Sequence, residues 1–258
     1  MLFEIPLKNY RIAESLLKQH KFLKNLIFNM IHLKKGKLFV DSKKHPDLML
    51  FSMPGIDVLS GNPSHPELFS LLQSIPEMKG ILIPDIAWKI PLTAFFGPKL
   101  HNFIRTNFSS EKLSIAFLKT LNKPLPEGYE LKKIDISFTD EDLAIAPHIQ
   151  HFFGNVEQFV QQGIGYCIIH QNDIVSIASS FFPLREQTLE VQVNTIETKE
   201  YLRKGLGTHA TIALLTECIS NNIVPHWDAD NDIAKNMALK LGFTNPESYS
   251  VFFWLEEE

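Results

Sequence analysis

The pattern of apolar and polar positions is most regular in the second half of the chain. Apolar runs and alternation of period two predict strands over residues 129–134, 165–170, 174–182, 189–198, 224–228 and 249–255. Periodicity near 3.6 residues predicts helices over residues 139–153, 155–162, 205–221 and 231–241. The predicted order from residue 129 onward is therefore β-α-α-β-β-β-α-β-α-β, and no internal repeat is evident in the sequence.

Residues at the ends of these segments support the same elements. Thr139 can cap its helix together with Asp142, a weaker substitute for the glutamate of a capping box. Asn231 is a good N-cap for the last helix, and Gly242 is a natural C-terminal cap for it. A turn at Asn172-Asp173 joins the second and third strands into a hairpin.

The first half is less regular. It is expected to begin with a helix-rich segment over residues 10–33, followed by strand-like apolar runs at residues 48–51 and 80–83. We find no catalytic motif in it. Pro124, Pro126 and Gly128 disfavour regular structure between the halves. We therefore predict an accessory α/β domain over residues 1–122 and a second domain over residues 123–258.

The composition is that of an ordinary globular chain. Its 258 residues are 45% hydrophobic and 21% charged, and the net charge of −4 argues against a general nucleic-acid binder. Cys167 and Cys218 lie in apolar runs, which predicts buried thiols rather than a disulfide or a metal pair. We expect no signal peptide, because no basic segment leads into a long apolar run over residues 1–10, and no apolar run reaches the length of a membrane helix. We therefore expect a cytoplasmic protein with neither a nucleic-acid nor a membrane partner.

The most informative segment is residues 202–208, where a long strand gives way to a helix. Gly205 and Gly207 allow the backbone to approach a ligand closely, because no Cβ is in the way. The first amides of a helix have no partner inside it, and the helix dipole favours an anion there. Arg203 and Lys204 add fixed positive charge. The segment therefore predicts a phosphate or pyrophosphate site.

Two common phosphate loops fit this segment poorly. A P-loop needs a lysine followed by Ser or Thr directly after its last glycine, whereas Lys204 precedes Gly205. The dinucleotide fingerprint fits in spacing through Gly205, Gly207 and Ala210, with Asp228 about 20 residues further on. That fingerprint should, however, follow its strand directly and open a series of parallel βαβ units. A dinucleotide-binding oxidoreductase is therefore the more remote alternative.

Residues 202–207 read Leu-Arg-Lys-Gly-Leu-Gly, and they resemble the Gln/Arg-x-x-Gly-x-Gly/Ala loop of the GNAT superfamily of N-acetyltransferases. The resemblance covers residues 129–254. Residues 227–231 and 238–243 are also similar to a subgroup that includes the zwittermicin A resistance acetyltransferase, with a weaker likeness through residues 55–66 and 84–88. The resemblance implies an α+β (α/β) fold with a mixed, mostly antiparallel central sheet flanked by helices. The smaller α/β domain before it is expected to be a degenerate GNAT-like copy.

The resemblance implies acetyl-CoA-dependent transfer of an acetyl group to a primary amine of a small molecule, such as an amino-polyol or an antibiotic-like amine. The implied partners are acetyl-CoA and that amine, with a homodimer as a further option and no metal. The pantetheine arm is expected beside the strand over residues 189–198, and the pyrophosphate on the amides that follow. The expected cofactor-binding residues are Ile196, Glu197, Thr198, Arg203, Lys204, Gly205, Leu206, Gly207, Thr208 and Asn231.

The candidate catalytic residues come from the long strand before the glycine loop. Apolar Leu189, Val191 and Val193 alternate there with Glu190, Gln192 and Asn194, so one face should meet a helix while the other can line a cleft. Glu190 is the candidate general base, acting directly or through water, and Glu197 is a second candidate nearer the glycines. The competing interpretation is a polar strand face and a charged strand end without chemistry.

Some positions depart from the superfamily pattern or suggest another chemistry. Ala238 stands where many members place a tyrosine thought to protonate the departing thiolate, which keeps open a non-catalytic acyl-CoA-binding module. His148 and His151 lie three residues apart on a predicted helix, but no third ligand at suitable spacing supports a metal site. His209 and His226 are expected to be packed or surface residues rather than catalytic ones.

Overall fold

The computed structural model describes residues 2–256, which divide into two compact units. Unit 1 runs from the N-terminus to Arg105 and includes the C-terminal segment from Ser248 onward, whereas unit 2 comprises Thr106–Glu247. None of the helices within residues 2–256 reaches the length and hydrophobicity needed to span a bilayer.

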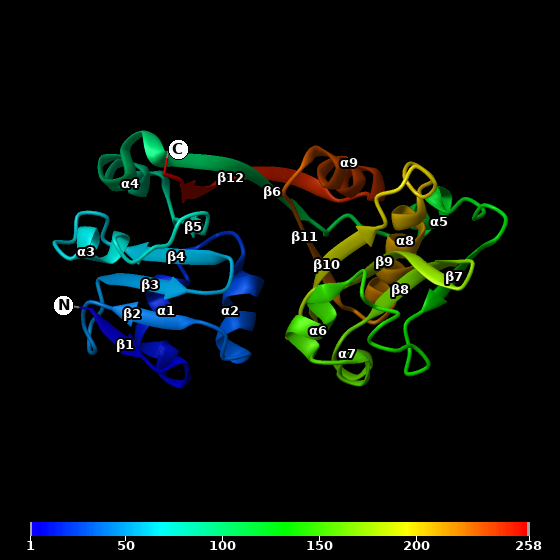
Figure 1. The fold of residues 1–258 in the computed structure, drawn as a ribbon, viewed down its shortest axis with the longest axis horizontal. Coiled ribbons are helices and arrows are strands. Elements are labelled where there is room, and N and C mark those ends of the chain that lie inside the picture. The colour runs from blue at the N-terminus through cyan, green and yellow to red at the C-terminus, as the bar shows by residue number, and fades with distance from the viewer. Residues whose placement is uncertain (1, 257–258) are drawn as a thin grey trace. The chain divides into compact units, whose positions relative to one another are not determined.

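Unit 2 has the predicted mixed sheet flanked by helices (Figure 1). Its strands are ordered β6-β11-β10-β9-β8-β7; the β10–β11 pair is parallel, and the other neighbours are antiparallel. A single parallel pair is not the parallel series that a dinucleotide-binding fold requires. The elements from β6 onward are β6 (Leu100–Ser109), α5 (Ile115–Leu121), β7 (Tyr129–Lys133), α6 (Pro147–Phe153), α7 (Val156–Gln162), β8 (Gly165–His170), β9 (Asp173–Ser180), β10 (Thr188–Thr195), α8 (Leu206–Ser220), β11 (Val224–Ala229), α9 (Asp232–Leu241) and β12 (Thr244–Trp254), which contributes to the sheet of unit 1.

Successive strand residues show which helices cover which face of this sheet. Cys167 packs in a cluster with Phe153 of α6 and Phe159 of α7, whereas its neighbour Ile168 packs in another cluster with residues of α8, among them Cys218. Because successive strand residues point to opposite faces, α8 covers one face, and α6 and α7 cover the other. Cys167 and Cys218 are buried free thiols, as predicted, and burial raises the pKa of each to about 12.

Unit 1 shows the same arrangement of strands. They are ordered β1-β2-β3-β4-β5-β12; the β4–β5 pair is parallel, and the other neighbours are antiparallel. A buried cluster that includes Trp88, Leu59 and Phe252 fills its core. The elements are β1 (Phe3–Ile5), the 3-10 helix Leu7–Ala13, α1 (Glu14–Leu17), α2 (Lys24–His32), β2 (Lys37–Val40), β3 (Leu48–Ser52), β4 (Ile56–Gly61), α3 (Leu68–Leu72), β5 (Gly80–Leu82), the 3-10 helix Ile86–Trp88, α4 (Lys89–Phe96) and the 3-10 helix Gly97–Lys99.

The two halves of the chain repeat one topology and exchange their last strands. From β1 to β6 and from β7 to β12, the order of strands and α-helices is β-α-α-β-β-β-α-β-α-β. The last strand of the first series, β6, pairs with β11 in unit 2, and the last strand of the second series, β12, pairs with β5 in unit 1. This shared topology supports the expectation that the first half is a degenerate copy.

The exchange also bears on where the chain divides. The C-terminal half of β6 belongs to unit 2, and α5 packs there through Leu118 in a cluster with Ile212 of α8 and Leu241 of α9. The segment from Ser248 onward belongs to unit 1. The compact units therefore do not coincide with residues 1–122 and 123–258, and the assignment of an accessory and a catalytic domain to those ranges stays a prediction.

Several predicted elements differ from the structure in their bounds. The helix predicted over residues 139–153 is wrong in its first half: α6 begins at Pro147, which lacks an amide hydrogen and suits the first turn of a helix. Thr139 and Asp142 do cap one another, but they close a single turn. The hairpin turn lies at Gln171-Asn172, one residue earlier than predicted, and both residues have positive φ. The helix-rich start is broken at Leu23, which also has positive φ.

Candidate functional site

Strands β10 and β11 are paired over only part of their length. Their parallel ladder joins Thr188, Leu189 and Glu190 to residues 224–226. Beyond Glu190, β10 pairs with β9 as far as Thr195, while β11 pairs with β6 over residues 227–229. Among residues 2–256, the edge of β10 that faces β11 therefore has no strand partner after Glu190. An extended ligand arm can add to such an edge as another strand would.

The segment between β10 and α8 forms a turn that ends in an open helix terminus. Arg203 and Gly205 have left-handed backbone conformations, with φ of 62° and 77°. Gly205 is the N-cap of α8, and no side chain caps this end. The first-turn N–H groups therefore have no acceptor inside the helix and are placed to bind an anion. These groups belong to Leu206, Gly207 and Thr208.

The two loop glycines are required for different physical reasons. A Cβ added at Gly205 would have no heavy atom within 4 Å, so Gly205 serves the left-handed turn and leaves the loop open. A Cβ at Gly207 would lie 3.1 Å from Cγ1 of Val193 and 3.3 Å from Oγ1 of Thr195. Gly207 therefore lets α8 pack closely against β10. Substitution at Gly207 would disturb packing as well as any ligand, so Gly205 is the cleaner position for a test.

The side chains of Arg203 and Lys204, the two basic residues of the loop, lie in different surroundings. The Nζ of Lys204 donates to the hydroxyl of Tyr129 at 3.0 Å and lies 5.1 Å from the centre of that ring. The Tyr129 ring is stacked on His170, with centroids 4.3 Å apart. The hydrogen bond to Tyr129 raises the pKa of Lys204. Arg203 is exposed at the turn itself. The side chain of Lys204 is thus held by β7, while that of Arg203 stays at the loop.

The structure places Glu190 on the polar face of β10, as the alternation predicts. Leu189 belongs to the cluster that contains α8 residues, and Val191 and Val193 pack against the same cluster. Glu190 therefore lies on the opposite face, with Gln192 and Asn194. The Gln192 amide donates to Oδ1 of Asn194 at 3.0 Å.

Two further polar residues lie on this face: His226, which the sequence did not assign to a site, and Asp228, which it offered only to the dinucleotide alternative. His226 is the partner of Glu190 in the parallel ladder, so the two side chains lie on the same face. Asp228 follows two residues later on β11 and is paired with Asn107 of β6. Burial lowers the pKa of His226, which favours its neutral form. In the sequence, Pro225, Trp227 and Ala229 alternate with His226 and Asp228, which indicates that these two polar side chains share one face of β11. Placing that face beside Glu190 requires the register between β10 and β11, which the sequence does not give.

The remaining predicted cofactor residues lie around the end of β10. Ile196 is partly buried, and its N–H donates to the carbonyl oxygen of Val175 at 3.0 Å. Glu197 and Thr198 are exposed in the segment after the strand. Glu197 therefore lies beyond the polar face that carries Glu190. Thr198 accepts hydrogen bonds from the backbone of residues 201 and 202, which closes the turn toward the glycines.

Helix α9 carries the N-cap and the departure from the superfamily pattern. Asn231 caps α9, because its Oδ1 accepts from the Ala234 N–H at 2.9 Å, and its side chain is also exposed. The capping role is thus confirmed, whereas a contact with a cofactor stays a prediction. Ala238 is fully buried in a cluster with Trp227 and Phe243. Ala238, the position at which the resemblance implies a tyrosine in many members, therefore packs in the core.

The histidines of α6 do not form a metal site in this structure. His148 is buried, its Nε2 lies 2.9 Å from Oγ of Ser179, and its ring stacks on Phe181. Burial lowers the pKa of His148 to about 4, against an opposing hydrogen bond with the backbone of Ser180. Within residues 2–256 no group of three or more His, Cys, Asp or Glu side chains is placed to hold a metal ion.

We expect stability to fall when the pH drops below the ordinary histidine range. His148 and the buried His20 each have a folded-state pKa of about 4, lowered by burial from 6.5. The unfolded chain therefore binds their protons first, and stability is lost as pH falls from 6.5 toward 4. At pH 5 the loss is about 2 kcal/mol for each histidine. Urea unfolding at pH 7 and pH 5 measures it. His148→Gln should remove the part of this loss that is due to His148. An unchanged difference in the free energy of unfolding between pH 7 and pH 5 in that variant would contradict the lowered pKa of His148.

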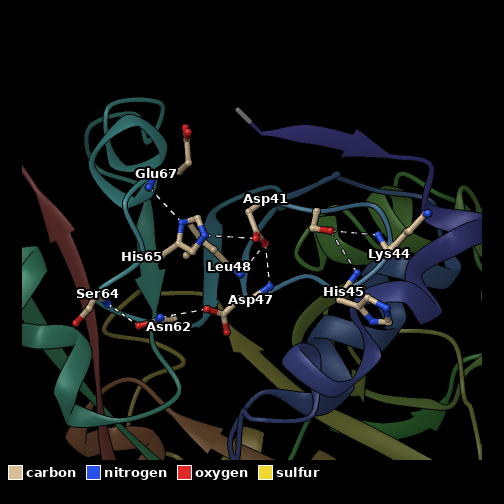
Figure 2. A network of polar contacts seen from close by, with 10 residues as sticks. Asp41, Lys44, His45, Asp47, Leu48, Asn62, Ser64, His65 and Glu67 are labelled. Carbon is tan, nitrogen blue, oxygen red and sulfur yellow. Dashed lines mark hydrogen bonds and ion pairs between the residues drawn. The ribbon is translucent and has the colours of Figure 1, made fainter.

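The equivalent loop of unit 1 is closed by its own side chains. It spans residues 62–67 between β4 and α3, and it contains Pro63 and Pro66, whereas the loop before α8 ends in Gly205. Nδ1 of His65 accepts from the Glu67 N–H at 3.1 Å, and its Nε2 lies 3.4 Å from Oδ2 of Asp41 (Figure 2). An amide near the start of α3 is therefore already bonded, and a carboxylate stands beside it. This loop therefore lacks the open helix terminus found before α8.

Two carboxylates, those of Asp41 and Asp47, lie beside the loop of unit 1. The Asn62 side-chain amide donates to Oδ2 of Asp47 at 3.1 Å (Figure 2). Oδ1 of Asp41 accepts from the backbone of Asp47 and Leu48 at 2.9 and 2.8 Å. These carboxylates would repel a phosphate at the same place.

The chain is similar to known acetyltransferases along nearly its whole length. The model of the GNAT acetyltransferase family matches residues 14–252. One curated relative, the uncharacterized N-acetyltransferase YdfB of Bacillus subtilis (strain 168), is 31% identical over 169 residues. That match covers 64% of this chain and 62% of the relative, so it spans less than two thirds of the relative's length.

Solved structures show the same fold in other organisms. A GCN5-related N-acetyltransferase-like protein from Streptococcus suis has a TM-score of 0.74 at 23% identity, covering 97% of this chain and 100% of that one. A GNAT-family acetyltransferase from Colwellia psychrerythraea has a TM-score of 0.62 at 11% identity, covering 99% and 100%. A tandem GNAT protein from the clavulanic acid biosynthesis pathway also has a TM-score of 0.62 at 11% identity, covering 98% and 97%.

Proposed function

The chain belongs to the GNAT acetyltransferase family, and from that membership we propose that unit 2 transfers an acetyl group from acetyl-CoA to a primary amine of a small molecule. The observation that carries the proposal is the open loop before α8, where the left-handed Gly205 leads into an uncapped helix terminus. Such a terminus suits a pyrophosphate. The unpaired edge of β10 next to it suits the pantetheine arm.

The residues around β10 fit the needs of the reaction. Acetyl-CoA supplies the acyl group as a thioester, which the amine attacks directly. The new C–N bond forms as the C–S bond breaks, and the amine must lose a proton for this to occur. Glu190 is the proposed acceptor of that proton, directly or through water, because it lies on the polar face where the β10–β11 ladder ends. With Ala238 buried, the departing thiolate takes its proton from another group or from solvent.

The acceptor is the less constrained half of the proposal. Similarity to the subgroup that includes the zwittermicin A resistance acetyltransferase suggests an amino-polyol or antibiotic-like amine. Substrate loops in one fold serve many acceptors, so this assignment rests on resemblance alone. A homodimer and a cytoplasmic location also stay predictions.

We expect one acetyl-CoA to bind each chain. The loop before α8 offers free first-turn amides, whereas the loop of unit 1 is closed by His65 and flanked by Asp41 and Asp47. Titration calorimetry should therefore give a stoichiometry near one. Acetyl-CoA at 100 times its dissociation constant should add about 2.7 kcal/mol to the free energy of unfolding. Absence of binding heat and of any melting shift would overturn the proposal, and a stoichiometry of two would contradict the closed loop of unit 1.

A non-catalytic acyl-CoA-binding module is the second candidate. The observation that favours it is Ala238, which is buried in the core at the position of the superfamily tyrosine. In that case acetyl-CoA would bind, but no free thiol would appear with any amine of a broad panel. Thiol release with one amine would exclude it.

A further inference from the structure

A cleft with an aromatic wall lies on the face of unit 2 that carries Glu190. It is lined by Phe181, which follows β9, and by the outer residues of α6, and it has a volume of about 710 Å³. Phe152 and Phe181 are partly buried, with ring centroids 5.1 Å apart. Both rings rest on the buried Phe182, at 4.7 and 4.6 Å between centroids. The complete lining is Pro147, His148, Gln150, His151, Phe152 and Phe181.

The wall is next to the proposed base. The Phe181 N–H donates to the carbonyl oxygen of Glu190 at 2.8 Å, which continues the antiparallel ladder that pairs Ser180 with Val191. Directly opposed residues of a ladder share a face, with their Cβ atoms about 5 Å apart. The Phe181 ring and the Glu190 carboxylate are therefore neighbours on the same face of the sheet. His226, the ladder partner of Glu190 on β11, lies on the other side of that carboxylate.

His148 extends the wall as an uncharged surface. Its ring stacks on Phe181 with centroids 5.3 Å apart and an interplanar angle of 22°. Its Nε2 is engaged by Ser179, which holds the ring in place. Because burial lowers its pKa to about 4, the imidazole is neutral at physiological pH and does not repel a cation.

We infer that the acceptor is an amine attached to an apolar, aromatic body, whose body packs on Phe152 and Phe181 while its amine reaches Glu190. This inference rests on the proposed acetyl transfer. Flat apolar groups gain from contact with aromatic rings, and a protonated amine gains from both the ring faces and the carboxylate. Gln150 and His151 add polar groups to the lining, but an amino-polyol would still leave hydroxyl groups against the rings of Phe152 and Phe181, which cannot hydrogen-bond to them. The wall therefore favours an arylalkylamine over a polyol.

The test compares primary amines as acceptors in the full-length protein by thiol release from acetyl-CoA. We expect KM for 2-phenylethylamine to be at least about 10-fold lower than KM for ethanolamine or for an amino sugar. Phe181→Ala should raise KM for 2-phenylethylamine about 10-fold and leave KM for ethanolamine within about 3-fold. Phe181→Leu and Phe152→Ala provide milder changes, and melting temperatures verify that each variant is folded. Phe69→Ala, which removes an exposed ring stacked on Phe95 in unit 1, is the matched control and should change neither KM.

The outcomes separate this inference from the proposed function. If acetyl-CoA binds but no amine releases thiol, the acetyl-transfer proposal fails, and the inference fails with it. If polar amines are used as well as or better than 2-phenylethylamine, the inference is overturned while acetyl transfer stands. The same holds if Phe181→Ala and Phe152→Ala both leave the ratio of KM values unchanged.

Discussion

Replacing Glu190 by glutamine should lower kcat by about 100- to 10,000-fold, which is the usual contribution of a positioned general base. Glutamine keeps the size of the side chain but cannot accept the proton of the attacking amine. The dissociation constant for acetyl-CoA should stay within about 3-fold, because the pyrophosphate is proposed to bind the amides before α8 rather than the polar face of β10. Steady-state thiol release gives kcat, and calorimetry gives the affinity.

The same measurement on Glu197→Gln separates the two candidate bases. Glu197 is exposed in the segment beyond the end of β10, whereas Glu190 lies on the polar face of the strand beside His226. We expect Glu197→Gln to keep near-normal kcat. The reverse pattern, with normal kcat in Glu190→Gln and a large loss in Glu197→Gln, would move the base to the end of the strand. Normal kcat in both variants would point to His226, which His226→Asn would then test.

Gly205→Val should weaken acetyl-CoA binding by at least about 100-fold. Gly205 has φ of 77°, a conformation that costs a residue with a side chain about 1–2 kcal/mol. Valine would therefore shift the turn and place a branched side chain at the terminus where the pyrophosphate is proposed to bind. Calorimetry measures the affinity, and the melting temperature of the free protein measures the cost to the fold.

A matched control separates backbone strain from loss of the site. Gly55 in unit 1 has φ of 78°, and a Cβ built there also has no heavy atom within 4 Å. Gly55→Val therefore carries a similar strain at a turn of unit 1, and it should lower stability by a similar amount while binding acetyl-CoA normally. Equal affinity in Gly205→Val and the wild type would show that the loop before α8 does not bind the cofactor.

The strand, loop and helix of the candidate site could be predicted from the sequence because each depends on local signals. Alternation placed Glu190 opposite the apolar face that meets α8, and glycine spacing placed the loop before that helix. The helix over residues 139–153 was overpredicted, because the cap formed by Thr139 and Asp142 is a valid local signal that closes only one turn. A capping pair does not determine how far a helix continues. The helix that does form, α6, begins at Pro147.

The features that the sequence did not predict depend on contacts between distant segments. His226 and Asp228 join the polar face only through the register of β11 with β10 and β6. The Phe181 wall requires α6 to lie over the end of β9, which no spacing along the chain specifies. The shared topology was not evident as a sequence repeat, because the two series share an order of elements and strand directions rather than residues.

The exchanged last strands offer a reason why a copy without an open ligand loop persists. After a duplication, a redundant copy is normally free to be lost. Here the first series supplies β6, which borders β11 beside the polar face of unit 2, and the second series supplies β12, which completes the sheet of unit 1. Deleting the first series would therefore take an edge away from the sheet that carries Glu190. If unit 2 carries the activity, as proposed, selection for it would also maintain the first series, even with Pro63 and Pro66 in the loop before α3.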